Sequence, residues 1–215
     1  MKHVKLISDL SKVRVVPVID PKQEKNYQSS VAAMIKGGAT VLEVTLRSNY
    51  AFELFAELRA NYPELLLGAG SVMSKEIFDK AILLGANFTV SPGRDSTLEQ
   101  YAQTNGCTHI PGVLTPSEII SARAAGHKLL KFYPSEAAGG AQALKDISRI
   151  FPDLKFMPSG GIKQEKLPGY SAVSGVASVG GSWMFWSDGT LRDASEIENL
   201  TRASILKMQE NNFDK

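Results

Sequence analysis

Eight short apolar runs recur along this chain, and their starts lie roughly 20 to 27 residues apart, as in an alternating strand–helix pattern. The runs occupy residues 14–19, 41–46, 65–70, 88–91, 108–110, 128–132, 155–157 and 176–179. Segments with helical spacing of apolar residues lie between most of them. Strands that alternate with helices pair in parallel, and eight such units predict a closed (β/α)₈ barrel, or TIM barrel. An open doubly wound sheet is the alternative, but no GxGxxG fingerprint follows the first run.

Most of the expected helices have start or stop signals. They span residues 22–36, 51–61, 74–84, 95–105, 115–125, 140–150 and 193–208, whereas 163–167 is too short to assign, and a short helix at 2–12 precedes the first strand. Thr115 provides a side-chain cap, Pro116 suits the first helical position, and Glu118 completes a capping box. A length of 215 residues fits one domain, so residues 1–215 are expected to form a single barrel.

Charge and cysteine content argue against several classes of protein. The net charge is only +2 and the basic residues are scattered, so no nucleic-acid partner is expected. The single cysteine, Cys107, cannot form an internal disulfide. No run approaches the roughly 18 apolar residues of a membrane span, and residues 1–20 lack the apolar core of a signal peptide. A soluble cytoplasmic protein with no membrane partner is therefore expected.

Lys131 stands out within the sixth apolar run. The run reads Lys128-Leu-Leu-Lys-Phe132, and Pro134 ends it because proline supplies no ladder donor. Side chains alternate along a strand, so Lys131 shares one face with Leu129. Desolvation favours the neutral amine, which is a nucleophile toward carbonyl carbon. From this run alone, a lysine that extends its ammonium group to the surface is the favoured interpretation, and the rest of the chain has to decide between the two.

Glu43 lies in the second apolar run, between Leu42 and Val44. A carboxylate there indicates either a structural ion pair or general acid–base chemistry. The second and sixth strands of an eight-stranded barrel lie across its axis, and inward side chains from alternate strands share a layer. Glu43 and Lys131 are therefore expected to meet inside the barrel, and such a pair without a function would carry a large desolvation penalty.

The ends of other strands suggest where a substrate binds. Arg47 follows the second strand, where a guanidinium can bind a carboxylate or phosphate, although a solvated loop arginine is the alternative. The loops after strands seven and eight of this fold commonly bind phosphate, and here they contain the glycine-rich stretches 158–162 and 180–182. Glycines let backbone N–H groups approach an anion, and Ser182 adds a hydroxyl donor. The Ser71 hydroxyl after the third strand is a further candidate ligand for a substrate oxygen.

No cluster of metal ligands is visible in the sequence. His3 lies in the N-terminal tail and His127 at the start of the sixth strand, which leaves His109 alone in range of the expected barrel mouth. Neither a metal nor a cofactor is expected, and amine catalysis fits the chain better.

Taken together, these segments resemble the 2-keto-3-deoxy-6-phosphogluconate (KDPG) and 4-hydroxy-2-oxoglutarate (KHG) aldolases, the class I enzymes of the Entner–Doudoroff pathway. The resemblance covers about residues 10 to 186 and follows the family's order. The joint occurrence of Glu43-Val-Thr-Leu-Arg47 and Lys131-Phe-Tyr-Pro134 is its specific part. The other matching segments are individually weaker, and they lie at residues 14–19, 68–72, 91–93, 111–116, 158–162 and 180–183.

The resemblance implies a role for each matching residue. Lys131 falls on the Schiff-base lysine, Glu43 on the acid–base glutamate and Arg47 on the carboxylate-binding arginine. The implied substrate-binding positions are Arg47, Ser71, Pro92, Tyr133, Ser159, Gly160, Gly161 and Ser182, the last four on the phosphate side. The family also implies a homotrimer.

Departures from the family pattern concern the substrate rather than the chemistry. Ser71 and Ser159 stand where threonine is commoner, Tyr133 stands where phenylalanine is commoner, and residues 185–190 are less typical. The expected activity is reversible cleavage of KDPG to pyruvate and glyceraldehyde 3-phosphate, with KHG as a further substrate. A 2-keto-3-deoxy-6-phosphogalactonate aldolase, a phosphosugar isomerase or epimerase that uses Glu43 as a base, and a non-catalytic sugar-phosphate sensor are the alternatives.

Overall fold

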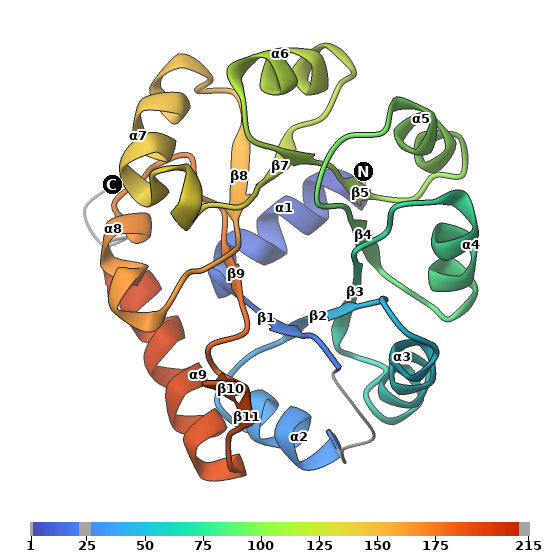
Figure 1. The fold of residues 1–215 in the computed structure, drawn as a ribbon, viewed down its shortest axis with the longest axis vertical. Helices are drawn as coiled ribbons and strands as arrows, with labels where there is room; N and C mark the ends of the chain where they lie inside the picture. Colours follow the sequence, from blue (N-terminus) through green and yellow to red (C-terminus); the bar gives the residue numbers. More distant parts are fainter. Residues whose placement is uncertain (1, 22–26, 211–215) are drawn as a thin grey trace.

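A computed structural model describes residues 2–21 and 27–210. Parallel strands dominate it, and their bounds are β1 (Val15–Ile19), β2 (Val41–Thr45), β3 (Leu66–Gly70), β4 (Phe88–Val90), β5 (His109–Ile110), β6 (Gly112–Val113), β7 (Leu129–Phe132), β8 (Lys155–Pro158) and β9 (Val179–Gly181). Six of them form one sheet in the order β5-β4-β3-β2-β1-β9, and β6-β7-β8 form another. The result is an α/β fold in which the strands curve around a common centre and helices cover their outer side (Figure 1).

The helices follow the strands as predicted. Their bounds are α1 (Lys2–Val13), α2 (Gln28–Lys36), α3 (Asn49–Asn61), α4 (Lys75–Leu83), α5 (Ser96–Thr104), α6 (Pro116–Ala124), α7 (Gly140–Ile150), α8 (Leu167–Ser171) and α9 (Ala194–Gln209), with 3₁₀ turns η1 (Glu136–Ala138) and η2 (Gln164–Lys166). The capping box at Thr115 and Glu118 is present, and Pro116 begins α6. None of the described helices is long and apolar enough to cross a membrane.

Several predicted bounds need correction. The helix predicted over 22–36 begins at Gln28, and residues 22–26 of that prediction lie outside the described residues. The run at 108–110 continues past Pro111 into β6, because proline interrupts the ladder without ending the extended chain. The eighth strand begins at Val179, not at residue 176, where Val176 makes only an isolated bridge to Phe156.

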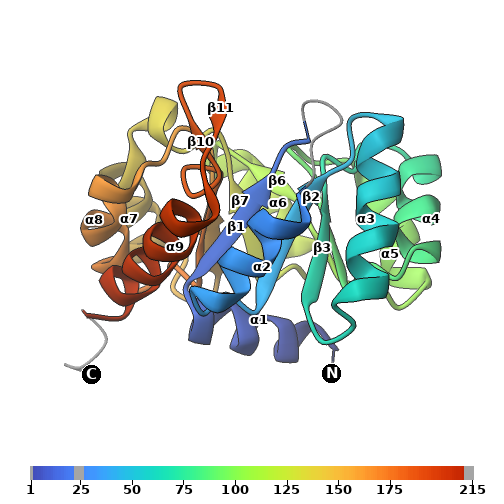
Figure 2. The same cartoon turned by 90° about the horizontal axis from the view of Figure 1, so that it is seen from below.

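One hairpin was not predicted. Strands β10 (Trp186–Ser187) and β11 (Thr190–Leu191) pair antiparallel around Asp188 and Gly189. Both turn residues have positive φ, 48° and 81°, as a two-residue type I′ turn requires. Figure 2 shows this hairpin at one end of the strands and α1 across the other end.

The side chains on the two faces of strands such as β2 and β7 pack into different apolar clusters. Val41 and Leu129 face inward, where Leu6 and Leu10 of α1 join them in one apolar cluster. Leu42 and Val44, Leu130 and Phe132 belong to the clusters that pack against the outer helices. Because side chains alternate, Glu43 and Lys131 lie on the same inward face, two residues further along than Val41 and Leu129.

Candidate active site

Lys131 is buried although its side chain ends in an amine. Its side chain is 9% exposed, and its Nζ lies 5.1 Å from the centre of the Tyr133 ring, within the range of a cation–π contact. Its backbone is fixed by parallel pairing of β7 with Gly112 on one side and Met157 on the other. Lys131 therefore does not extend to the surface, whereas Lys128, at the start of the same run, is half exposed, and its Nζ lies 3.3 Å from Asp153 Oδ2.

Glu43 and Lys131 meet on the inner side of the curved sheets. Glu43 Oε1 lies 3.7 Å from Lys131 Nζ, and the Glu43 side chain is 1% exposed. Neither carboxylate oxygen has a hydrogen-bond partner among the described residues. The pair is therefore an ion-pair contact at longer than hydrogen-bond distance, in a place where each charge loses most of its hydration.

Two inward glycines of β3 leave the space that this arrangement needs. A Cβ on Gly70 would lie 2.2 Å from Glu43 Oε1, and a Cβ on Gly68 would lie 2.2 Å from the Phe88 ring. Any other residue at position 70 would displace the carboxylate. In the sequence, the Gly68-Ala-Gly70 stretch at the end of the third strand is the signal for this close approach.

Arg47 is fixed beside Ser71. Arg47 Nε donates to Ser71 Oγ at 2.9 Å, and its Nη1 lies 3.3 Å from Asp20 Oδ2. Thr45 Oγ1 donates to the other oxygen of Asp20 at 2.7 Å. Ser71 is buried and has a φ of 59°, a left-handed conformation that costs a non-glycine residue free energy. Asp20 was missed because nothing in the sequence marks a carboxylate after the first strand as a partner of Arg47.

The two glycine-rich turns lie side by side. Ser159 and Gly180 form a parallel bridge, which places the end of β8 against β9. Gly160 and Gly161 have φ values of 98° and 77°, and a Cβ on Gly160 would lie 3.0 Å from the Tyr133 ring. The turn therefore packs on Tyr133, which lies two residues after Lys131.

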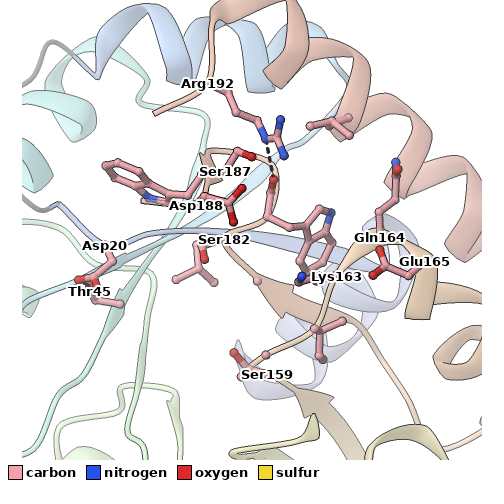
Figure 3. A pocket seen from close by; sticks show the side chains of 18 of the residues that line it. Asp20, Thr45, Ser159, Lys163, Gln164, Glu165, Ser182, Ser187, Asp188 and Arg192 are labelled. Carbon is pink, nitrogen blue, oxygen red and sulfur yellow. Dashed lines mark hydrogen bonds between the residues drawn. The ribbon is translucent and has the colours of Figure 1, made fainter. Parts of the chain in front are cut away.

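A cavity of about 570 Å³ opens at this end of the strands. Of the predicted substrate-binding residues, its wall contains Arg47, Ser159, Gly160, Gly161 and Ser182. Asp20, Lys163, Asp188 and Arg192 also line it, and Figure 3 shows the last three around the same hollow as Ser182.

Five predicted site residues do not line this cavity among the described residues. They are Glu43, Ser71, Pro92, Lys131 and Tyr133. Glu43 lies one inward position below Thr45, which does line the cavity, so the buried pair lies deeper than the cavity floor. Pro92 packs on the neighbouring strand, since a Cβ on Gly112 would lie 2.3 Å from the Pro92 carbonyl.

His109 and His127 do not lie on the inner side of the curved sheets. His109 accepts or donates hydrogen bonds with Thr89 Oγ1 at 2.8 Å and with Ser91 Oγ at 3.2 Å. Ile110 faces inward, so His109 faces the helices and not the barrel mouth, which corrects the sequence-based placement. Burial, followed by the nearby His127, lowers the pKa of His109 to about 4.

His127 contacts Glu99 instead. His127 Nε2 lies 3.0 Å from Glu99 Oε2, and Arg94 forms a two-pronged contact with the same carboxylate. Burial opposes ionisation of Glu99, but the hydrogen bonds from His127 and Arg94 outweigh it and lower the pKa to about 2. Among the described residues, no three His, Cys, Asp or Glu side chains gather as a metal site.

The sequence profile of KDPG and KHG aldolases matches residues 6–201. The chain belongs to the KDPG and KHG aldolase family. A 2-dehydro-3-deoxy-phosphogluconate aldolase of Pseudomonas aeruginosa is 36% identical over 92% of this chain and 90% of its own length. The KHG/KDPG aldolase of Escherichia coli is 35% identical over 87% of each chain.

A solved KDPG aldolase structure gives the most specific comparison. The enzyme from Legionella pneumophila, with pyruvate captured at low pH as a covalent carbinolamine intermediate, is 35% identical. Its TM-score is 0.84, and the match covers 92% of this aldolase and 96% of that chain. The match in fold therefore extends over most of both chains.

Proposed function

We propose that this aldolase cleaves 2-keto-4-hydroxy acids through a Schiff base on Lys131, with KDPG as the main substrate and KHG as a further one. The observation that carries the proposal is the buried contact of 3.7 Å between Lys131 Nζ and Glu43 Oε1. A covalent carbinolamine with pyruvate in the Legionella relative supports the same chemistry.

The first half of the reaction forms the imine. Lys131 first passes a proton to Glu43, and its neutral amine then attacks the C2 carbonyl carbon. A C–N bond forms, the C=O π bond breaks, and a proton moves from the nitrogen to the oxygen to give a carbinolamine. Glu43 donates a proton to the leaving hydroxyl, and water departs to give a protonated imine. The positive nitrogen then serves as the electron sink for the next step.

The second half breaks the carbon–carbon bond. Glu43, now a carboxylate, takes the proton of the C4 hydroxyl, and the C3–C4 electron pair moves into the iminium to give an enamine. The aldehyde leaves, which is glyceraldehyde 3-phosphate when KDPG is the substrate and glyoxylate when it is KHG. Glu43 returns this proton to C3 of the enamine, and water hydrolyses the resulting iminium to release pyruvate and free Lys131.

The remaining predicted residues bind the two ends of the substrate. Arg47, already held by Asp20, and the Ser71 hydroxyl bind the pyruvyl carboxylate. Pro92 and Tyr133 line the pocket around the imine. The residues assigned to the phosphate are Ser159, Gly160, Gly161 and Ser182.

Closure of the strands into one (β/α)₈ barrel over residues 1–215 is part of the proposal. Two observations support it: the parallel bridge between Ser159 and Gly180 connects β8 to β9, and β5 continues into β6 across Pro111. The family resemblance supports a homotrimer and a place in the Entner–Doudoroff pathway, and composition supports a cytoplasmic location. None of the proposed steps uses a metal or a cofactor.

A coupled pyruvate-release assay tests the substrate directly. We expect turnover of KDPG, slower turnover of KHG, and little of the galactonate epimer. Faster release from the epimer would reassign the enzyme to 2-keto-3-deoxy-6-phosphogalactonate. Isomerisation of a sugar phosphate without pyruvate release would favour the isomerase alternative, and binding without turnover would favour the sensor.

A further inference from the structure

Charged side chains of both signs line the cavity. The cations are Arg47, Lys163 and Arg192, and the anions are Asp20, Glu165 and Asp188. Equal numbers of each mean that the wall as a whole does not favour an anion. Charged side chains that form no ion pair or hydrogen bond within the protein remain available to the substrate. They therefore decide how strongly the cavity attracts a phosphate.

Two of the three cations are committed to the protein. Arg47 contacts Asp20 and Ser71. Arg192 Nε donates to the Trp183 carbonyl at 3.2 Å, and its Nη1 contacts Glu196 Oε1 at 3.2 Å. The backbone N–H of Arg192 donates to the Phe185 carbonyl, so this residue holds the base of the β10–β11 hairpin.

Lys163 is the uncommitted cation of the wall. Among the described residues, no carboxylate lies within ion-pair distance of its ammonium group, and its side chain makes no hydrogen bond. It follows Gly161 by two positions, and the intervening Ile162 is buried and anchors the turn. The ammonium group is therefore tethered beside the turn to which the phosphate is assigned.

Two anions of the wall, Glu165 and Asp188, have no ion-pair or hydrogen-bond partner among the described residues, and Asp188 is the one that lies near Ser182 (Figure 3). Asp188 occupies the left-handed first position of the hairpin turn, and within the described chain its carboxylate has neither an ion-pair nor a hydrogen-bond partner. Figure 3 shows its side chain directed toward the hollow near Ser182. A negative group there repels a phosphate and favours a distal group of lower charge.

We propose that Lys163 and Asp188 are two opposed specificity-determining residues that set how strongly this aldolase prefers a phosphorylated substrate end. The inference rests on the proposed function. Gly160, Gly161 and Ser182 supply only neutral donors, whereas a phosphate monoester carries about −1.5 to −2 charges at pH 7. Lys163 supplies a positive charge that compensates the phosphate, and the negative charge of Asp188 weakens the attraction.

The test compares kcat/KM for KDPG with kcat/KM for KHG, whose distal carboxylate carries a single charge. Lys163→Met should lower the KDPG/KHG ratio about threefold to tenfold, in the range of exposed and charge-assisted ion pairs. Lys163→Arg keeps the charge and should restore most of the ratio. Lys166→Met is the matched control, because Lys166 lies in the same segment, contacts Glu136 at 3.8 Å and is outside this wall.

Asp188→Asn should change the KDPG/KHG ratio in the opposite direction to Lys163→Met. Asn tolerates the left-handed turn position and removes the charge, so the hairpin should persist. We expect the KDPG/KHG ratio to rise about twofold to fivefold. Both effects should shrink as ionic strength is raised, because salt screens exposed charges. Unchanged ratios in both Lys163→Met and Asp188→Asn overturn the proposal.

A binding measurement separates this inference from the proposed reaction. Inorganic phosphate binds the folded state and should raise the Tm of the wild-type protein, less in Lys163→Met and more in Asp188→Asn. If the wild-type protein releases no pyruvate from either substrate, the proposed reaction is wrong. In that case the ordering of the phosphate-dependent Tm shifts still supports the two assignments, and equal shifts in all three proteins overturn them.

Discussion

Glu43 is placed where its charge is costly. The side chain is almost completely buried, no protein donor among the described residues satisfies either oxygen, and Lys131 Nζ lies 3.7 Å away. Burial of such a pair is weak evidence for stability, because the desolvation cost of two charges rivals their attraction. The arrangement is better explained by chemistry, since a substrate between the two groups would give the carboxylate a proton to move.

Glu43→Gln should therefore lower kcat by about 10² to 10⁴-fold, the range of general acid–base catalysis, and leave the fold intact. The amide keeps the shape of the side chain but cannot exchange a proton at the C4 hydroxyl. Steady-state kinetics together with far-UV circular dichroism checks both parts. Unchanged turnover in a folded variant would remove Glu43 from the mechanism.

Gly70 controls the position of that carboxylate. Gly70→Ala places a Cβ 2.2 Å from Glu43 Oε1, so the carboxylate must move and kcat should fall by at least about tenfold, as expected when a catalytic group is misplaced. Gly93→Ala is the control, because a Cβ there meets nothing within 4 Å. Equal activity of Gly70→Ala and Gly93→Ala would contradict the packing argument.

At the scale of elements, capping residues in the sequence were sufficient to locate most of the predicted helix starts. Ser74, Asp95, Thr115 and Asp193 cap the N-termini of α4, α5, α6 and α9 with side-chain hydrogen bonds. The start of α2 could not be located in this way, because Tyr27 makes no capping side-chain bond. Helices with polar caps are thus predictable locally, whereas α2 is positioned by packing.

The β10–β11 hairpin shows the opposite case. Its signal, Asp188-Gly189, was present, but each strand is only two residues long and carries no alternating pattern. The pairing depends on neighbours that the chain brings near only after folding. Lys163 and Asp188 were missed for the same reason, since they share a cavity wall through two loops far apart in sequence.

The contact between β4 and β5 should make the protein sensitive to acid. Burial lowers the pKa of His109 to about 4, whereas an unfolded histidine titrates near 6.5. The unfolded state therefore binds more protons between these values, and stability falls as the pH is lowered from about 6.5 to about 4. Glu99, with a pKa of about 2, extends the loss below about pH 4.5.

Urea unfolding at pH 7 and pH 5 measures the effect. We expect the wild-type protein to lose roughly 1 to 2 kcal/mol between the two, from the His109 shift alone. His109→Gln removes the titrating group, so its stability should change less over this interval whatever its absolute value. A pH dependence in His109→Gln equal to that of the wild type would assign the acid sensitivity elsewhere.

For the whole molecule, strand alternation proved the most informative feature of the sequence. It predicted that Glu43 and Lys131 face inward from opposite strands, and they do. It could not predict which loop side chains line the cavity above them. Asp20 and Arg192 are defined by hydrogen bonds to Thr45 and to the Trp183 carbonyl, which depend on the folded paths of separate loops.

The proposed trimer is a property of the complete molecule. Met73 and Leu114, 57% and 39% exposed, follow β3 and β6 at the same end of the parallel strands, and an interface would remove such apolar side chains from water. Multi-angle light scattering should give three times the chain mass of 23.3 kDa. The mass of a single chain at micromolar concentration would contradict the homotrimer.

The covalent bond to Lys131 can be tested most directly by trapping. The protein is incubated with pyruvate and sodium borohydride, digested, and analysed by peptide mass spectrometry. The reduced pyruvyl group should appear on Lys131, persist in Lys128→Met, and be absent from Lys131→Met, which should also be inactive. Labelling of a different lysine, or no labelling in a protein that retains full activity, would contradict the Schiff-base mechanism.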